Sequence, residues 1–148
     1  MNYYEIIKLI KDISLKHPFV NSFFNDRYAL IGNENDINYG VISLLNEQHQ
    51  IGEQISTFRF KIIYADRLTD DNNKVHIQNV GIDTLTEIWN ALKNVNYIDI
   101  NEGLNVNVFE GQFADNCAGA IADLNIVVRS KIGSCEWISE FDICQENN

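Results

Sequence analysis

Two stretches of the chain repeat hydrophobic residues at helical spacing. Over residues 3–16, Ile6 and Ile10 fall on one face while most charged residues lie off it, which predicts an amphipathic helix. Pro18 ends this helix because a proline disfavours helical geometry in the residue before it. A second helix is predicted over residues 75–94, where apolar positions recur every three or four residues. Its core face comprises Ile77, Gly81, Leu85, Ile88, Trp89 and Leu92.

Four further stretches are predicted to be strands. Residues 39–45 are a compact apolar run, and residues 55–65, 104–108 and 120–128 alternate apolar and polar residues, as is typical of strands with one buried face. In the second, which is the clearest, every other position is apolar and predicted to be core: Phe58, Phe60, Ile62 and Tyr64. The first two strands are expected to form an antiparallel hairpin joined by the polar loop from Glu47 to Glu53. A second polar loop is expected from Glu110 to Asn116.

The order of elements is therefore helix, two strands, helix, two strands. Hairpin-joined strands with both helices on one side predict an α+β fold of two layers, in which two helices cover one face of a four-stranded antiparallel or mixed sheet. Residues 1–130 are expected to form this single domain. Residues 131–148 are expected to form a C-terminal arm or tail, because their apolar residues are isolated. These residues are Trp137, Ile138, Phe141 and Ile143.

The net charge of the chain disfavours one class of function, the binding of nucleic acid. The 148 residues include 11 Lys and Arg against 21 Asp and Glu, a formal net charge of -10. A domain that grips nucleic acid needs a cluster of cations for the phosphates, and none is present here. The N-terminal helix carries charges at Glu5, Lys8, Lys11 and Asp12, so it resembles neither a signal peptide nor a membrane span. We expect a protein made in the cytoplasm with no membrane contact.

The residues that commonly carry chemistry are scattered along the sequence. Cys117, Cys135 and Cys144 form no Cys-x-x-Cys pair, so reduced thiols are expected. His17, His49 and His76 are far apart, which disfavours zinc. The glycine-rich loops of nucleotide sites and the Gly-x-Ser-x-Gly motif of hydrolases are both missing from the sequence. We therefore expect no catalytic residue, no metal and no cofactor.

One acidic cluster invites a metal interpretation. Asp66, Asp70 and Asp71 lie close together just before the second predicted helix. The cluster lacks the glycine turn and the distal glutamate of a calcium loop. A solvated turn that caps the following helix is the favoured interpretation.

The sequence from the strand at 58 into the second helix resembles the small neck and tail-completion proteins of tailed bacteriophages. The similarity rests on the run from Phe58 to Leu68, the polar turn at 70–73, and His76 to Asn79 opening the helix. The order of elements over residues 1–130 is similar to that of tail-terminator subunits. The resemblance implies a virion ring, commonly a hexamer, that joins the tail to the head-side connector and lets DNA pass. Other neck, portal-connector and tail-tube proteins would be its partners.

In such a ring the sheet would extend between neighbouring copies, and the loops would touch the rings above and below. The candidate contacts come from the two polar loops: Glu47, Gln48, Gln50, Glu53, Glu110, Gln112 and Asp115. Taken singly, each of these residues also fits an ordinary solvated turn, which is the commoner role. Six copies would carry a charge of about -60, and acids facing a channel would repel DNA phosphates.

Two alternatives stay open from the sequence. One is a small cytoplasmic enzyme that uses Asp66, Asp70 or Asp123. The other is a cytoplasmic module that binds a peptide or a small ligand. Neither alternative has a motif in its support.

Overall fold

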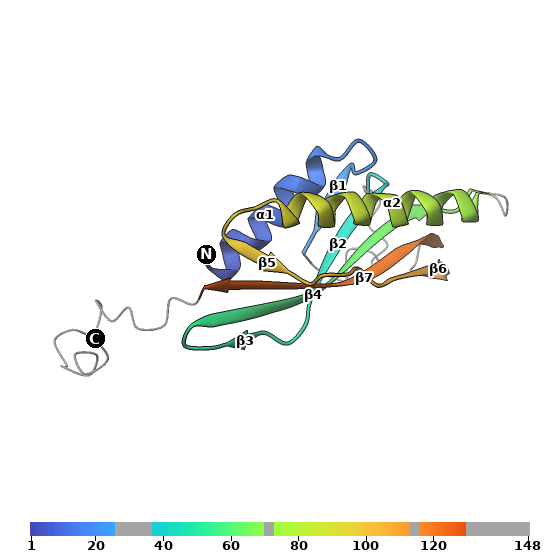
Figure 1. Ribbon diagram of the computed structural model, residues 1–148. Helices are drawn as coiled ribbons and strands as arrows, with labels where there is room; N and C mark the ends of the chain where they lie inside the picture. The colour runs from blue at the N-terminus through green and yellow to red at the C-terminus, as the bar shows by residue number, and fades with distance from the viewer. Residues whose placement is uncertain (26–36, 70–72, 113–115, 130–148) are drawn as a thin grey trace, which may run out of the picture.

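The computed structural model describes residues 1–25, 37–69, 73–112 and 116–129. These residues form an α+β fold with two helices and one mixed sheet of seven strands (Figure 1). The elements in chain order are α1 (Tyr3–Lys16), β1 (Ser22–Phe24), β2 (Val41–Asn46), β3 (Gln50–Ile51), β4 (Ile55–Arg67), α2 (Lys74–Lys93), β5 (Ile98–Ile100), β6 (Val106–Gln112) and β7 (Cys117–Arg129).

The centre of the sheet is an antiparallel pair of long strands. β4 and β7 each have 13 residues and pair over their full length, from Ile55 opposite Arg129 to Arg67 opposite Cys117. The sheet runs β1-β2-β4-β7-β5, with β3 also paired to β4 and β6 also paired to β7. Because β1 pairs with β2 in parallel, the sheet is mixed.

Each long strand has two short strands in tandem on its outer edge. On β4, β2 pairs up to Phe60 and β3 resumes at Thr57. Residues 47–49 therefore face only two residues of β4, which is the geometry of a β-bulge. His49 fills the gap: its Nδ1 accepts the backbone N–H of Arg59 at 3.2 Å. The backbone N–H of Glu47 donates to the carbonyl of Arg59 at 2.9 Å.

The gap on the β7 edge is filled in the same way by Asn101. Its Oδ1 accepts the backbone N–H of Asn125 at 3.3 Å, and its own N–H donates to the carbonyl of Asn125 at 3.3 Å. The indole Nε1–H of Trp89 donates to the Asn101 carbonyl at 3.2 Å and holds this residue from α2. Arg59 and Asn125 are register partners, so both gaps fall at one level of the sheet. We call this level the waist: Arg59, Asn125, His49 and Asn101.

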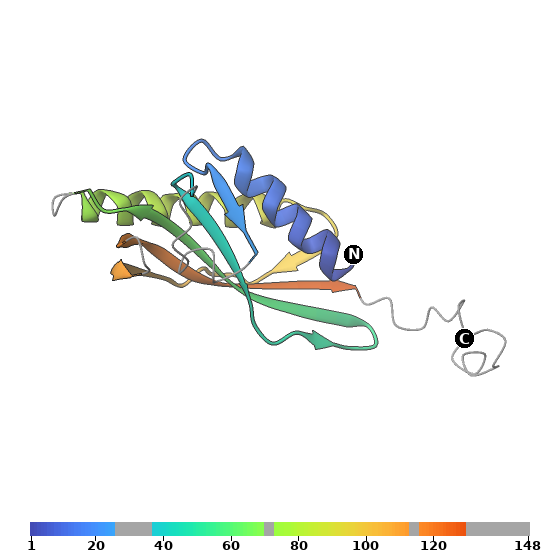
Figure 2. The same ribbon diagram turned by 180° about the vertical axis from the view of Figure 1, so that it is seen from behind.

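Both helices cover the same face of the sheet (Figures 1 and 2). Their buried residues join the even-numbered side chains of β4 in one hydrophobic core. An Asn2–Glu5 capping box starts α1, with reciprocal hydrogen bonds of 2.8 and 2.9 Å. At the other end of α1, His17 Nε2 lies 2.6 Å from Glu87 Oε2 of α2, which ties the two helices together. The largest fully buried helical side chains are Ile6, Ile10, Leu85, Ile88 and Leu92.

A second, smaller apolar cluster lies on the opposite face, at the end of the sheet where β4 finishes. Val41, Ile63, Ala65 and Cys117 are buried in it. Phe24, at the end of β1, and Ile37 and Tyr39, before β2, also pack against it. Adjacent parallel strands need a crossover connection, and the chain both leaves β1 and returns to β2 on this face.

The predicted four-stranded sheet was wrong. The structure contains seven strands in its described residues, and the three that the sequence did not predict have only two or three residues. Strands this short cannot show an alternating pattern. One gap at the waist separates β3 from β2, and the other separates β5 from β6. The polar residues in these gaps have the composition of a turn or linker. β1 lies in a polar stretch to which no element was assigned.

The longer elements have the predicted type. The two helices begin and end within one residue of their expected bounds, 3–16 and 75–94. β2 and β4 form the expected antiparallel pair. The proposed arm over residues 131–148 lies outside the described residues. In the described part of the chain, neither helix is long and apolar enough to cross a membrane.

Close packing of α2 on the sheet explains the glycine in its middle. A Cβ at Gly81 would lie 3.0 Å from Ala120 Cβ and 3.2 Å from Tyr64 Cδ1, tighter than ordinary contacts. Only glycine lets the helix approach this closely, which outweighs its cost of about 1 kcal/mol in a helix.

We therefore expect Gly81→Val to lower the free energy of unfolding by about 1–3 kcal/mol through overpacking. Denaturant titration measures this loss. Gly103→Val is the matched control, because nothing lies within 4 Å of a Cβ added there. Equal effects of the two substitutions would contradict the packing explanation.

Candidate interaction surface around Tyr97

Tyr97 lies in the turn that joins α2 to β5. The helix ends with backbone bonds from Asn94 to the carbonyl of Ala91 and from Val95 to that of Leu92. The chain then reverses into β5, and the Tyr97 side chain remains 61% exposed. The aromatic ring of Tyr97 lines two hollows in the surface, one toward α1 and one toward the end of the sheet.

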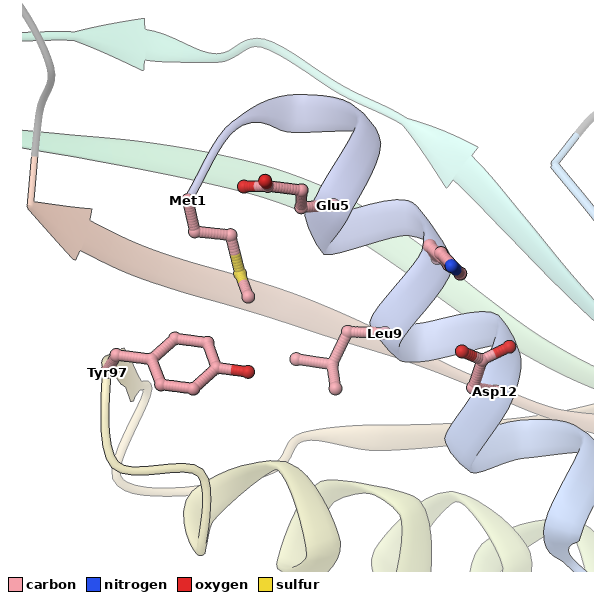
Figure 3. A pocket seen from close by; sticks show the side chains of 6 residues that line it. Met1, Glu5, Leu9, Asp12 and Tyr97 are labelled. Carbon is pink, nitrogen blue, oxygen red and sulfur yellow. The ribbon is translucent and has the colours of Figure 1, made fainter.

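The first hollow has a volume of about 570 Å³ and lies between α1 and Tyr97. In Figure 3 the Tyr97 hydroxyl reaches toward Leu9, and the Met1 side chain extends into the same space. The Glu5 carboxylate at its rim is engaged in the capping box of α1. The lining residues are Met1, Glu5, Lys8, Leu9, Asp12 and Tyr97.

The second hollow, of about 500 Å³, lies where β4 and β5 begin and β7 ends. Its apolar side chains include Ile55, which is 59% exposed. Polar groups come from Asn96, Asp99 and Arg129, the last described residue of β7. Ile98, Val127 and Val128 complete its lining with Tyr97.

Apolar and aromatic side chains line this surface together with charged ones. Within the described ranges, no three His, Cys, Asp or Glu side chains gather closely enough to hold a metal ion. The exposed groups that a partner could cover are Tyr97 and Ile55. Burying a side chain of this size contributes about 1.5–3 kcal/mol, so these two residues would supply most of the apolar contact with a partner.

The residues predicted for the first contact loop are all exposed. Glu47 lies 3.5 Å from Lys61 Nζ, which also contacts Asp123 at 3.3 Å. The hydrogen bond and charge of Asp123, with the charge of Glu47, raise the pKa of Lys61 above its usual value. Gln48, Gln50 and Glu53 point to solvent in the bulge, β3 and the following turn.

The second contact loop lies at the opposite end of the sheet. Glu110 forms an ion pair with Lys74 at the start of α2, at 2.9 Å. Gln112 is the last residue of β6, opposite Cys117, so β6 continues into the predicted loop. Asp115 lies outside the described residues. Gln50 lies opposite Thr57, and Gln112 lies opposite Cys117, the partner of Arg67. These two levels are ten residues of β4 apart, roughly 33 Å, whereas Glu47 lies nearer the middle of the sheet, beside Lys61.

The two aspartates of the enzyme hypothesis that the structure describes, Asp66 and Asp123, do not come together. Asp66 accepts the backbone N–H of Arg67 at 2.8 Å, and it lies on the face of β4 that the helices cover. Asp123 pairs with Lys61 on the other face. Asp70 and Asp71, the remaining members of the predicted capping turn, lie outside the described residues, as do Cys135 and Cys144.

Each histidine has a separate place in the structure. His17 bridges the helices, and His76 is exposed on α2. His49 packs against Tyr3, Phe58 and Phe60, with ring centroids 5.2–5.3 Å away. All four apolar positions predicted as core in β4 are buried: Phe58, Ile62 and Tyr64 are 2–6% exposed, and Phe60 is fully buried.

Sequence reasoning did not single out Tyr97 or its surface. The only signal was an aromatic residue between Asn96 and Ile98, shortly after a predicted helix. Its importance arises from the distant segments, α1 and the end of β7, that fold next to it. The fold and this surface define a small α+β protein with an exposed, partly apolar contact site. Comparison with protein-family models gave no match, and comparison with curated proteins gave no significant relative.

The position of His49 gives a testable pH dependence. Burial lowers the pKa of His49 in the folded chain below its usual value of about 6.5. As the pH falls below 6.5, the unfolded chain binds a proton that folded His49 resists, so stability is lost. Protonation of Nδ1 also removes the acceptor for the Arg59 N–H.

We expect the free energy of unfolding to fall less between about pH 7.5 and pH 5 in His49→Gln than in the native chain. Denaturant titrations across this range measure the difference. His76→Gln, an exposed histidine on α2, should keep the native pH dependence. A native slope in His49→Gln would show that another group titrates.

Proposed function

We propose that this chain is a structural virion protein of a tailed bacteriophage, a ring subunit of the neck or tail. It would act as a tail terminator or head-tail connector and join the tail to the head-side connector. The supporting observation is the separation of the two predicted contact loops along β4: Gln50 of the first lies opposite Thr57, and Gln112 of the second lies at the level of Arg67, roughly 33 Å away. A subunit between two stacked rings needs contact surfaces at both ends.

The edges of the sheet offer a way for copies to associate. Among the described residues, β1 and β5 end the path of the sheet, and each pairs with one strand only. An edge strand keeps a row of backbone donors and acceptors that a neighbour's strand can use. Extension of the sheet from one copy to the next is therefore our model for ring formation, with a hexamer as the expected state.

The acidic charge agrees with a conduit for DNA. With a net charge of -10 per chain, a ring repels phosphates wherever its acids face the channel. DNA would pass through without being held. The partners in this proposal are other neck, portal-connector and tail-tube proteins, in a virion assembled in the cytoplasm of the host bacterium. The enzyme alternative receives no support from Asp66 and Asp123, which lie on opposite faces of the sheet.

Mass photometry and electron microscopy of the purified protein test ring formation. We expect closed particles of about six 17.0 kDa chains. A chain that stays monomeric at high concentration and never associates with virions would overturn the proposal.

The contact loop is tested separately. Glu53→Arg reverses a charge in the exposed β3–β4 turn and should lower binding to the adjoining ring about tenfold, or ~1.4 kcal/mol. Incorporation into virions, measured by complementation, reports the loss. Asp83→Arg, a matched charge reversal on the exposed side of α2, should have no effect. Equal incorporation of the two variants would remove the Glu47 to Glu53 loop from the interface.

A further inference from the structure

The chain continues for 19 residues beyond the second hollow of the Tyr97 surface. Arg129, which lines this hollow, is the last described residue, and residues 130–148 follow it. Trp137 and Phe141 are the large aromatic residues of this segment. The seven residues between Arg129 and Trp137 span at most about 23 Å when extended. Two aromatic side chains are thus tethered within reach of a Tyr97 surface.

The two aromatic residues of the C-terminal segment match the two hollows of the Tyr97 surface in number and in apolar character. Trp137 and Phe141 are four positions apart, with Ile138 next to the first. Two hollows, of about 570 and 500 Å³, flank Tyr97. Both volumes lie within the range of about 300–1,000 Å³ that is typical of pockets for small organic groups. One aromatic anchor for each hollow would cover Tyr97 and Ile55, the exposed apolar residues of the surface.

Charged residues on the Tyr97 surface and in the C-terminal segment would orient the segment on the surface. Lys8 lies at the first hollow and Arg129 at the second. In the C-terminal segment, Glu136 precedes Trp137 and Glu140 precedes Phe141, so each aromatic residue brings an acid next to it. Acids at the hollows offset the two cations: Glu5, Asp12 and Asp99. The affinity should therefore come mainly from the apolar contacts.

We propose that residues 137–143 of one copy occupy the Tyr97 surface of the next copy in the ring. This inference rests on the proposed ring function. The arm and the surface are different parts of the chain, so a contact repeated from each copy to the next is head-to-tail, the type that generates a ring when the rotation between copies closes. β7 runs along β4 to the end of the sheet, where Arg129 lies opposite Ile55, so residues 130–148 follow at the edge of the second hollow (Figure 1). The arm of each copy then links it to its neighbour.

Two full-length variants test the contact from its two sides. Trp137→Ala with Phe141→Ala removes the anchors, and Tyr97→Ser removes the centre of the surface. Each should weaken ring assembly at least tenfold in concentration-dependent mass photometry. Tyr4→Ser is the matched control, because Tyr4 is 72% exposed on α1 and does not line either hollow. Circular dichroism should show that all variants keep the native fold.

Disulfide trapping identifies which copy supplies the arm. Tyr97→Cys places a thiol on the surface, and native Cys135 lies two residues before Trp137. Oxidation should link neighbouring copies into a ladder from dimer to hexamer, which Cys135→Ser abolishes. A link confined to single chains would overturn the proposal in favour of docking within one copy. Rings that both variants leave unchanged would overturn the arm contact but not the ring function, whereas a native chain that never assembles would overturn both.

Discussion

The full-length pairing of β4 with β7 is the contact that organises the remaining elements. Both helices pack on one face of this pair, and the cluster around Val41 and Ile63 packs on the other. All of the short strands except β1 are attached directly to its edges. Small side chains in β7 set the distance to the helix layer, because α2 approaches closely where Gly81 meets Ala120. A shift in register of one residue would turn every core side chain of β4 to the opposite face.

Elements with long, regular patterns could be predicted from the sequence. α1, α2 and β4 each bury a continuous series of side chains, so their periodicity is strong. The number of strands could not be predicted, because β3 and β5 depend on pairing with distant residues and not on their own composition. The polar residues of the bulge at 47–49 fit a turn equally well, and only the tertiary structure shows that they interrupt an edge strand.

The candidate site was less accessible to sequence reasoning than the fold. The polar loops were identified by composition, and composition cannot show that the Glu47 carboxylate lies beside Lys61 or that Glu110 pairs with Lys74. Tyr97 was missed because its surface is made by several segments that are distant in the sequence. Its neighbours on the surface come from α1, β4 and β7, and a single sequence holds no record of contacts between segments so far apart. The chemistry of a surface made by several elements becomes visible only after folding.

The waist has a consequence for how this chain can change during evolution. At this level the backbone groups of Arg59 and Asn125 turn outward and bond to His49, Glu47 and Asn101. A residue gained or lost in the segments at 47–49 or 101–105 would be absorbed there, because neither segment belongs to the ladder between β4 and β7. The edges of the sheet can therefore vary in length and composition while the central register is inherited unchanged.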